Sequence, residues 1–452
     1  MNVIKPVKHT FVFMKYRSLL ILPLFVFFFS CSVPKQIAKS AKENVLNNDA
    51  LQTAHVGISI YEPASGKYWY NYQGDKYFVP ASNTKLPTCY AAMKYLGDSL
   101  VGFEYIVEDQ KTLVFKPTAD PTFLHTDFNS SREISFLKSF EKIGIVDTKQ
   151  KLDYFGSGWG MDDYMATYMA ERSEFPMYGN LVTIFRDNTG LHTYPKFFEK
   201  QNLFGNNFNA SWKGFDVQRQ LEANSFNIIE GNRNRITIPF HTREFLNENF
   251  SLRELRGMIS DTVHKEVGYF VLSRPVSMKK FHSQPTDSLL KPMMHRSDNF
   301  FAEQSLLMVS NELLGVMNDA KVIDTLLKTD FRDLPQKPRW VDGSGLSRYD
   351  LFTPQDFVFI LNKMKTDFGM DRIKTILPTG NDGTLEGRFV RDSNYIFAKT
   401  GTLSGVVSLS GFLYTKKNKL LIFSVLVNNH NSSAGDVRRA VEKFVQGVRD
   451  NY

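Results

Sequence analysis

The segment Pro80-Ala81-Ser82-Asn83-Thr84-Lys85-Leu86, residues 80–86, decides how the rest of this 452-residue chain is interpreted. A turn at Pro80-Ala81 precedes Ser82, and apolar residues at helical spacing then continue to Gly97. We therefore predict that Ser82 stands at the N-terminus of a helix. Because residues three positions apart share one face of a helix, Ser82 and Lys85 would lie side by side, within reach of a proton transfer.

Two further motifs follow this segment in order: Ser297-Asp298-Asn299, and then Lys399-Thr400-Gly401 with Thr402 directly after it. Together the three motifs supply a nucleophile with its base, a hydroxyl and an amide that complete proton transfer, and a cation that holds an anionic substrate. They therefore indicate a serine acyl-transfer site. The combination carries this interpretation, since Ser-x-x-Lys occurs six times in the chain, whereas Lys-Thr-Gly occurs once.

Each motif also has a structural alternative. Ser82 could cap its helix while Lys85 lies on the surface, and Ser297 and Asn299 could cap the helix that follows them. Lys399 could be no more than a charge at the end of a strand. These alternatives predict separate side chains, whereas an acyl-transfer site requires the three motifs to meet.

Periodicity in both halves of the chain predicts a mixed architecture. The predicted elements are a hairpin of Val56 to Tyr61 and Lys67 to Tyr72, a strand of Tyr395 to Ala398 that would carry Lys399 at its end, a hairpin of Ser408 to Tyr414 and Leu420 to Val427, and a closing helix of Ala434 to Val448. The residues alone therefore predict an α+β fold.

Length and charge limit the other possibilities. With 452 residues, of which 42% are hydrophobic, the chain can bury more than one core, and we expect two or three domains. Ser82 and Ser297 are 215 residues apart, which predicts a separate unit between the first two motifs. The net charge of +8 falls to +4 without residues 1–30, which hold four basic residues and no acidic one. Nucleic acid is therefore not an expected partner.

The N-terminal segment has the pattern of an export signal. Basic residues precede an apolar run from Ser18 to Ser30, and Cys31 follows directly. The run is too short for a spanning helix, and Phe28-Phe29-Ser30-Cys31 resembles a bacterial lipobox with cleavage before Cys31 and lipid on its sulfur. Plain secretion is the alternative. Cys89 would then be the one remaining cysteine, and we predict that it is a small buried residue on the helix of Ser82.

No metal-binding, phosphate-binding or dinucleotide motif occurs in the sequence, so no cofactor is predicted.

The three motifs resemble those of penicillin-binding proteins and serine β-lactamases, and longer strings are similar to the D-alanyl-D-alanine carboxypeptidase/endopeptidase family, peptidase family S13. The strings are residues 80–86, Ser297-Asp298-Asn299-Phe300-Phe301-Ala302-Glu303, Asp342-Gly343-Ser344-Gly345-Leu346-Ser347-Arg348, Leu377-Pro378 with Asp382-Gly383-Thr384-Leu385, and Lys399-Thr400-Gly401-Thr402-Leu403-Ser404-Gly405. The resemblance covers nearly the whole mature chain. It is loosest between residues 104 and 274, and Thr118-Ala119-Asp120-Pro121 lacks the glycine usual in the family.

This resemblance implies a fold and a cellular setting. The fold would be a β-lactamase/transpeptidase-like domain, an antiparallel sheet flanked by helices. Residues 1–30 would be the export signal, residues 31–103 and 275–452 would form this domain, and residues 104–274 would be inserted between the first two motifs. The protein would be a periplasmic, penicillin-sensitive peptidase, held to a bacterial membrane by lipid on Cys31. Its partners would be peptidoglycan stem peptides, with β-lactams as inhibitors.

The resemblance also implies roles in the chemistry. Ser82 would attack the carbonyl of the penultimate D-Ala, and Lys85 would take its proton as a neutral amine, favoured by desolvation and by the nearby cation Lys399. Ser297 would pass a proton to the leaving amine, and Asn299 would hold Lys85 and the substrate amide.

The same resemblance assigns residues to substrate binding. Lys399 and Thr400 would bind the terminal carboxylate, while Gly401 would keep the strand edge clear for the substrate backbone. The backbone N–H groups of Ser82 and Thr402 would bind the oxyanion. Three further residues are candidates for contact with the rest of the substrate: Arg348, Asp153 and Asp162.

Carboxypeptidase and endopeptidase activity are not separated by the sequence, because both use the same acyl-enzyme. Two other functions stay open: a non-catalytic peptidoglycan-binding lipoprotein, and a β-lactamase or esterase of the same fold.

Overall fold

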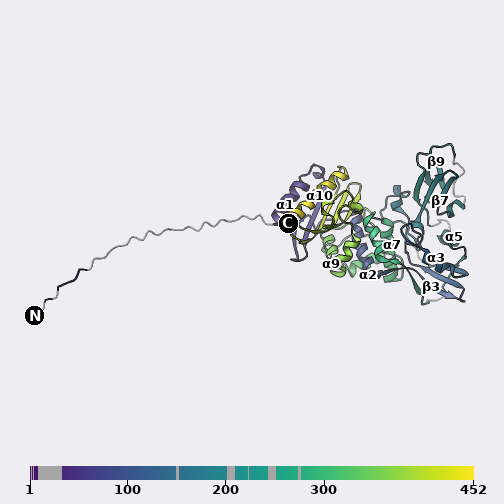
Figure 1. The fold of residues 1–452 in the computed structure, drawn as a ribbon, viewed down its shortest axis with the longest axis horizontal. Coiled ribbons are helices and arrows are strands. Elements are labelled where there is room, and N and C mark those ends of the chain that lie inside the picture. The colour runs from purple at the N-terminus through teal and green to yellow at the C-terminus, as the bar shows by residue number, and fades with distance from the viewer. Residues whose placement is uncertain are drawn as a thin grey trace.

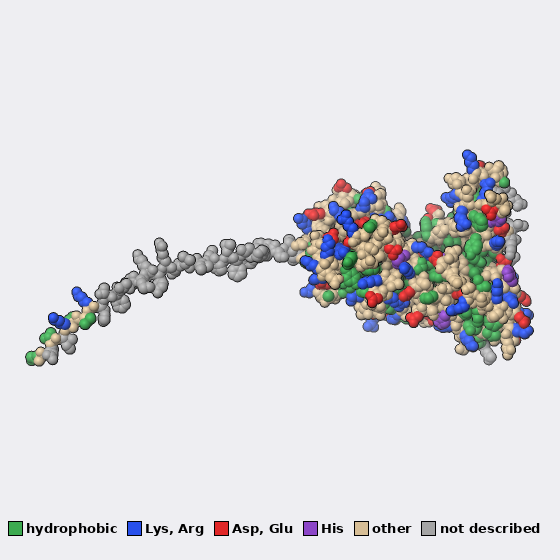
Figure 2. Space-filling view, in the orientation of Figure 1, with side chains coloured by type: hydrophobic (Ala, Val, Ile, Leu, Met, Phe, Trp, Pro, Cys, Tyr) green, Lys and Arg blue, Asp and Glu red, His purple; other side chains and the backbone are tan. Residues whose placement is uncertain are grey.

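The computed structural model describes residues 33–148, 152–200, 209–221, 223–242, 251–272 and 276–452, together with Met1, Val3 and residues 5–8. Figure 1 shows two lobes, one that contains both α1 (Val33–Ala41) and α10 (Ala434–Asn451) and one formed by the middle of the chain. In the space-filling view a notch separates the upper parts of the two lobes (Figure 2). Cys31 lies outside the described residues. Within them, no helix combines the length and the apolar character that a membrane span requires.

The first lobe is built on a five-stranded antiparallel sheet that joins both ends of the chain. Its strand order is β13-β14-β15-β1-β2, with bounds β1 (His55–Glu62), β2 (Lys67–Tyr72), β13 (Ile396–Leu403), β14 (Val406–Tyr414) and β15 (Leu420–Asn428). All neighbouring pairs are antiparallel. Both predicted hairpins are confirmed.

Strand β13 is longer than the sequence predicted. It pairs with β14 over eight residue pairs, from Ile396 opposite Leu413 to Leu403 opposite Val406, and Lys399 lies opposite Ser410. The prediction that Lys399 stands at the end of the strand is wrong, because backbone pairing with β14 continues past the apolar residues that mark the strand in the sequence. Lys399 therefore lies in the interior of an edge strand.

Each face of this sheet is covered by its own set of helices. Helices α1 and α10 pack on one face with strand residues such as Ile58 and Val425, while the other face, which includes Phe412 and Leu426, packs against a larger helical cluster. The helices of that cluster are α2 (Lys85–Tyr95), α6 (Thr286–His295), α7 (Asn299–Leu314), α8 (Asp319–Lys328) and α9 (Pro354–Ile376). The predicted closing helix is confirmed as α10, which ends three residues later than predicted.

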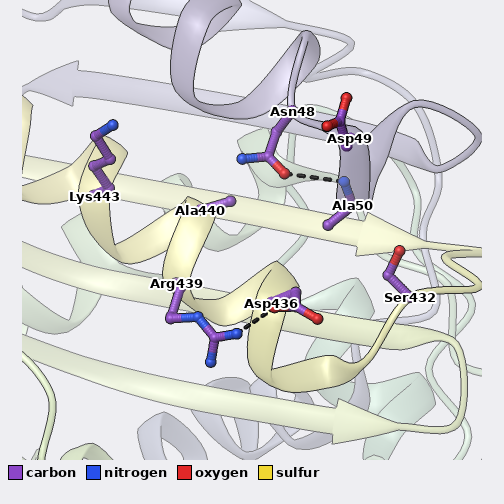
Figure 3. Close-up of a pocket in the computed structure, with 8 residues that line it drawn as sticks. All are labelled: Asn48, Asp49, Ala50, Ser432, Asp436, Arg439, Ala440 and Lys443. Carbon is purple, nitrogen blue, oxygen red and sulfur yellow. Dashed lines mark hydrogen bonds and ion pairs between the residues drawn. The ribbon is translucent and has the colours of Figure 1, made fainter.

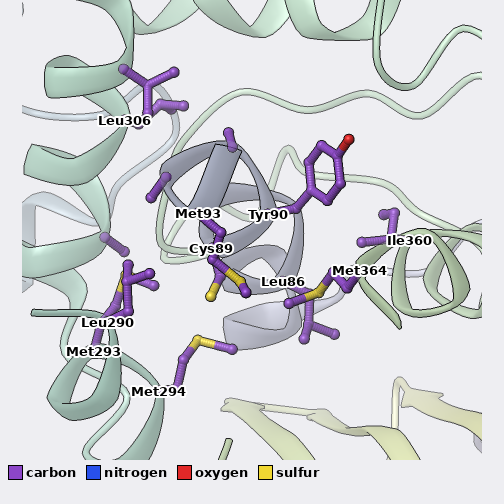
Figure 4. Close-up of a cluster of buried hydrophobic side chains, with 14 of the residues drawn as sticks. Leu86, Cys89, Tyr90, Met93, Leu290, Met293, Met294, Leu306, Ile360 and Met364 are labelled. Atoms are coloured by element: carbon purple, nitrogen blue, oxygen red, sulfur yellow. The ribbon is translucent and has the colours of Figure 1, made fainter. Parts of the chain in front are cut away.

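Helix α2 lies in the middle of the helical cluster, as Figure 4 shows. Every residue from Lys85 to Met93 is buried, including Cys89, as predicted. Burial raises the pKa of the Cys89 thiol to about 12, so this cysteine stays protonated and unreactive at neutral pH. A helix buried on all sides holds its first turn firmly, which fixes the position of the Ser82 segment at its start.

In its described residues, the second lobe has three sheets and a separate hydrophobic core. A mixed sheet has the order β11-β5-β4-β3-β12, and smaller sheets have the orders β10-β6-β7 and β8-β9. The strands are β3 (Ser99–Glu108), β4 (Thr112–Pro117), β5 (Lys142–Val146), β6 (Leu181–Asp187), β7 (Gly190–Tyr194), β8 (Gly214–Arg219), β9 (Phe226–Gly231), β10 (Arg235–Pro239), β11 (Glu266–Phe270) and β12 (Lys279–Pro285), and the helices are α3 (Ser131–Lys138), α4 (Phe197–Lys200) and α5 (Ser251–Val263).

This lobe begins with β3 and ends with β12, which pair with each other. Its core contains Phe103, Phe115 and Ile259 and is distinct from the two cores of the first lobe. We refer to residues 99–285 as the insertion. The division into domains at residues 104 and 274 stays a prediction.

Candidate active site

Ser82 lies in a 3-10 turn, η3 (Ala81–Thr84), that runs directly into α2. The predicted place of Ser82 at a helix N-terminus is therefore confirmed. Ala81 has a φ of +48°, in the left-handed region, and is buried. The Asn83 amide Nδ2 donates to Ser410 Oγ on β14 at 2.7 Å, which ties this turn to the sheet.

Lys85 brings the first two motifs together. Its Nζ lies 3.1 Å from Ser82 Oγ, 2.6 Å from Asn299 Oδ1 and 2.8 Å from the backbone oxygen of Ser344, and its side chain is 0% exposed. The alternative in which Lys85 is a surface residue is wrong. A lysine in contact with a serine hydroxyl is placed to exchange a proton with it.

Burial lowers the pKa of Lys85 to about 8, while the negative charges of Asp342, Glu303 and Asp298 act in the opposite direction. Desolvation therefore has the predicted effect, because an ammonium group without water loses more stabilisation than a neutral amine. A substantial fraction of Lys85 is then neutral and able to accept a proton near neutral pH.

Lys399 connects the third motif to the second. Its Nζ donates to Ser297 Oγ at 2.9 Å and to the backbone oxygen of Thr400 at 2.8 Å. The side chain is 0% exposed, and among the described residues its hydrogen-bond partners are a hydroxyl and a carbonyl oxygen, with no carboxylate. Burial and the neighbouring Lys85 place the pKa of Lys399 well below its ordinary value.

Lys85 and Lys399 lie close enough for their charges to interact, and the charge of Lys85 contributes to the lowered pKa of Lys399. Because repulsion between two cations acts on both partners, a charged Lys399 would favour the neutral form of Lys85, and this contribution stays a prediction. Burial is the main cause of the lowered pKa of Lys85. An anion bound beside Lys399 would favour the charged form of Lys399.

Ser297 and Asn299 do not cap helix α7. Asp298 is the N-cap, and its side chain accepts from the backbone N–H of Phe301 at 3.0 Å. Ser297 has a φ of +60°, in the left-handed region, which turns its side chain toward Lys399. The structural alternative for this motif is therefore wrong, and both side chains face the other two motifs.

The Asn299 amide has two partners. Oδ1 accepts from Lys85, and Nδ2 donates to the backbone oxygen of Tyr168 at 3.0 Å, in η5 (Thr167–Met169) of the insertion. The contact with Lys85 matches the predicted role of Asn299. The contact with Tyr168 occupies one of the two amide hydrogens and leaves the other for a substrate.

Gly401 has a packing role that the sequence did not predict, while its role in keeping the strand edge clear for the substrate stays a prediction. A Cβ atom at this position would lie 2.2 Å from Ser408 Oγ and 2.9 Å from both the backbone oxygen of Pro80 and the backbone nitrogen of Ser82. The missing side chain therefore allows β13 to approach the Ser82 turn. Gly401 sets the distance between the nucleophile and the third motif.

The remaining predicted residues lie around this centre with exposed or half-buried side chains. Thr400 is half-buried, and Thr402 is exposed and accepts from Arg438 Nη2 at 2.7 Å through its hydroxyl. Arg348 is exposed and donates to the backbone oxygen of Ser404, in the turn between β13 and β14. The site thus has a polar rim beside the edge strand.

Asp153 and Asp162 are both exposed and belong to the insertion. The backbone oxygen of Asp153 accepts from Arg172 Nε at 2.8 Å. The structure gives neither carboxylate a contact with Ser82, Lys85 or Lys399, so their part in substrate binding stays a prediction.

Residues 342–348 belong to the strings that carry the resemblance, but sequence reasoning missed that the loop of residues 342–350 holds Lys85. Asp342 is buried, and its carboxylate accepts from the backbone N–H groups of Gly345 and Ser347 at 2.8 and 2.7 Å. These bonds hold the loop so that the Ser344 carbonyl reaches Lys85. Gly345 has a φ of +78°, and a Cβ there would overlap the backbone oxygen of Ala81. The string Asp342-Gly343-Ser344-Gly345 was the available signal.

A separate surface pocket lies away from this site. Its lining residues come from η2 (Asp49–Leu51), the first turns of α10 and the residues just before each of them (Figure 3). The pocket lies on the face of the five-stranded sheet that α1 and α10 cover. Asp436 and Arg439 form an ion pair within it. None of the predicted site residues lines this pocket.

Comparison with known proteins gives one family. A family model described as D-Ala-D-Ala carboxypeptidase 3 (S13) matches residues 38–238 and 239–448. D-alanyl-D-alanine carboxypeptidase DacB from Haemophilus influenzae is 29% identical over 187 residues, which span 39% of this chain and 38% of that protein. Penicillin-sensitive carboxypeptidase A from Dictyostelium discoideum is 23% identical over 465 aligned positions, which cover 86% of each chain.

A solved structure shows the same fold. The crystal structure of penicillin binding protein 4 (dacB) from Haemophilus influenzae has a TM-score of 0.66 and 18% identity, and the match covers 91% of this chain and 98% of that one. The predicted architecture, a transpeptidase-like sheet with flanking helices, is therefore confirmed.

The lowered pKa of Lys85 predicts how acylation depends on pH. If neutral Lys85 accepts the proton of Ser82, the rate of acylation by a β-lactam should rise as the pH rises through about 8 and then level off. Stopped-flow measurement of the second-order acylation rate across this range tests the expectation. A rate that does not change there, or that rises only near the ordinary lysine value of 10.5, would contradict it.

The contacts of Gly401 predict the effect of a single methyl group. Gly401→Ala should lower the second-order rate of acylation by about 100-fold, because β13 must move away from the Ser82 turn. Gly268→Ala in β11 is the matched control, since a Cβ there meets no atom within 4 Å and the acylation rate should not change. Equal acylation rates for both variants, measured with circular dichroism to verify folding, would show that the close approach is unnecessary.

Proposed function

The chain belongs to the D-Ala-D-Ala carboxypeptidase 3 (S13) family, and we propose that it cleaves D-Ala-D-Ala peptides of peptidoglycan through an acyl-enzyme on Ser82. It is a serine-type DD-peptidase, a hydrolase. The observation that carries the assignment of residues is the meeting of all three motifs around two buried lysines, Lys85 and Lys399.

Acylation begins at Ser82. Its Oγ attacks the carbonyl carbon of the penultimate D-Ala while Lys85 Nζ, 3.1 Å away, takes the hydroxyl proton. Asn299 Oδ1 and the Ser344 carbonyl hold the amine of Lys85 in line with Ser82. The oxyanion is stabilised by the backbone N–H groups of Ser82 and Thr402.

Departure of the terminal residue needs a proton on its nitrogen. Ser297, whose Oγ accepts from Lys399 Nζ, passes its hydroxyl proton to this nitrogen and recovers the proton that Lys85 took from Ser82, so Lys85 is neutral again. The C–N bond breaks and the ester on Ser82 remains. Water then hydrolyses the ester with Lys85 as the base, and a proton returns to Ser82. A β-lactam follows the same path to the ester, but its leaving group stays attached and hydrolysis is slow.

Lys399 and Thr400 bind the terminal carboxylate of the substrate. In the described part of the chain the Lys399 amine has hydroxyl and carbonyl partners but no carboxylate, so an anionic ligand supplies the missing charge. A bound carboxylate raises the pKa of Lys399, and the restored cation then favours the neutral form of Lys85. Substrate binding therefore prepares the base for its reaction.

The enzyme acts outside the cytoplasm, where peptidoglycan is found, and lipid on Cys31 would hold it to a membrane. Two observations support the anchor. The first is the export pattern before Cys31. The second is that α1, which starts at Val33 and packs against α10, lies on the side of the first lobe that is remote from the insertion (Figure 1). Mass spectrometry of the protein extracted from membranes tests this, since an unmodified Cys31 would contradict it.

The two leaving groups define the choice between carboxypeptidase and endopeptidase. Arg348, exposed beside the end of β13, and Asp153 are proposed contacts for the substrate beyond the scissile bond. Because both activities share the acyl-enzyme, they are distinguished by the rates of hydrolysis of two substrates, a stem pentapeptide and a cross-linked peptide dimer.

Intact-protein mass spectrometry after incubation with a fluorescent penicillin tests the proposed nucleophile. The wild-type protein should carry one stable penicilloyl adduct, and Ser82→Ala should carry none, because Ser82 supplies the hydroxyl group among the hydrogen-bond partners of Lys85 Nζ in the described part of the chain. Ser404→Ala, in the neighbouring turn, is the matched control and should be acylated like the wild type. An adduct that survives in Ser82→Ala would contradict the assignment.

Two other results would favour the remaining functions. Rapid hydrolysis of penicillin without an accumulated adduct would indicate a β-lactamase. Neither an adduct nor hydrolysis would indicate a non-catalytic peptidoglycan-binding protein.

A further inference from the structure

Two adjacent residues of the insertion, Glu171 and Arg172, have fully buried side chains with separate sets of partners. The Glu171 carboxylate accepts from Arg219 Nη1 at 3.3 Å, from the backbone N–H of Thr242 at 2.8 Å and from its hydroxyl at 3.0 Å, and lies 2.9 Å from His241 Nδ1. Arg219 ends β8, and His241 follows β10. Glu171 therefore fixes this segment to the strands of the insertion.

Arg172 joins the insertion to the first lobe. Its Nη1 lies 3.3 Å from Glu303 Oε2 in α7 and 2.5 Å from Asp319 Oδ2 in α8. Its other nitrogens donate to the backbone oxygens of Asp153 and Phe155 at 2.8 and 2.9 Å. Because a guanidinium group presents its donors in a rigid plane, these four contacts fix the relative positions of α7, α8 and residues 153–155.

Glu303 continues this connection to the catalytic lysine. Its second oxygen, Oε1, accepts from the backbone N–H of Ser344 at 2.8 Å. The carbonyl oxygen of Ser344 in turn accepts from Lys85 Nζ at 2.8 Å. An unbroken series of hydrogen bonds therefore leads from Arg172 through Glu303 and Ser344 to Lys85, and every side chain in it is buried.

A second contact from the same segment reaches the other support of Lys85. The backbone oxygen of Tyr168, four residues before Arg172, accepts from Asn299 Nδ2. This contact orients the amide so that Oδ1 points to Lys85. Apart from Ser82, both groups that hold Lys85 are thus supported by residues 168–172 of the insertion.

The charges of Lys85, Glu303 and Arg172 along this series are buried. Lys85 faces Asp342, Glu303 and Asp298, together with Lys399. Glu303 faces Arg172, Asp342 and Asp319, and burial with the neighbouring Asp342 raises its pKa to about 7 while Arg172 opposes the rise. Removal of the Arg172 cation would therefore leave Glu303 protonated at neutral pH, and a neutral Glu303 no longer supports the charged form of Lys85.

We propose that Arg172 is a positioning residue of the active site, which holds the amine of Lys85 in line with Ser82 by acting through Glu303 and the Ser344 peptide. This inference rests on the proposed acyl-enzyme. It makes the insertion part of the machinery that places the catalytic base, in addition to any contact that the insertion makes with substrate. A purely structural ion pair would stabilise the fold without changing how acylation depends on pH.

The experiment measures the acylation rate by a fluorescent penicillin against pH in the full mature protein. Arg172→Met should lower the plateau rate by about ten-fold, because the series that aligns Lys85 is broken. Its apparent pKa should also fall below that of the wild type, since Glu303 loses its charge. Glu303→Gln should show the same two changes, because the amide cannot accept from Ser344 without opposing the Arg172 guanidinium. Arg172→Lys retains the cation and should keep the wild-type apparent pKa.

Arg449→Met is the matched control. Arg449 is a buried arginine of α10 that pairs with Asp392 at 2.7 Å, outside the active site. This variant should lose thermal stability and keep both the plateau rate and the apparent pKa. If Arg172→Met does not fold, Glu303→Gln provides the same test with a side chain of nearly equal shape.

Folded Arg172→Met and Glu303→Gln proteins with the plateau rate and apparent pKa of the wild type would overturn the inference while leaving the proposed function intact. A wild-type protein that is not acylated at all would overturn the proposed function and, with it, this inference.

Discussion

Two lysine side chains, Lys85 and Lys399, are buried in one site whose partners in the described part of the chain are hydroxyl, amide and carbonyl oxygens. Removing an ammonium group from water is costly unless a counter-charge or the loss of a proton compensates. The carboxylates of Asp342 and Glu303 act on Lys85 through their charge but are not among its hydrogen-bond partners. The result is a lysine that loses its proton near neutral pH beside a serine hydroxyl. The surrounding structure is arranged to keep this unfavourable pair in place.

The fold supplies that arrangement from four separate parts of the chain. The buried helix α2 fixes Ser82 and Lys85, α7 presents Asn299, the loop of residues 342–350 contributes a carbonyl, and β13 carries Lys399 against the Ser82 turn because Gly401 has no side chain. The insertion closes this assembly through the backbone of Tyr168 and the buried Arg172. Because the site is built from so many elements, its motifs lie far apart in the sequence.

The sequence predicted the residues with chemical groups of their own and missed those that act through the backbone. Ser82, Lys85, Ser297, Asn299 and Lys399 were identified because their types and order match a known pattern, and the hairpins were identified because their apolar residues alternate. The carbonyl of Tyr168 leaves no signal, since every residue has one, and the string around Ser344 does not indicate that the Ser344 carbonyl contacts Lys85. Strand β13 was predicted too short because pairing with β14, rather than composition, extends it, and Arg172 has no local feature that distinguishes it from a surface arginine.

The ionisation of Lys85 is the most direct test of this account. An NMR titration of the protein with isotope-labelled lysine side chains, with Lys85→Arg to assign the resonance, measures the pKa without relying on turnover. The account predicts a midpoint of about 8 for Lys85 in the free enzyme. A midpoint near the ordinary value of 10.5 would show that Lys85 stays charged at neutral pH, and it would contradict the role of this lysine as the base that activates Ser82.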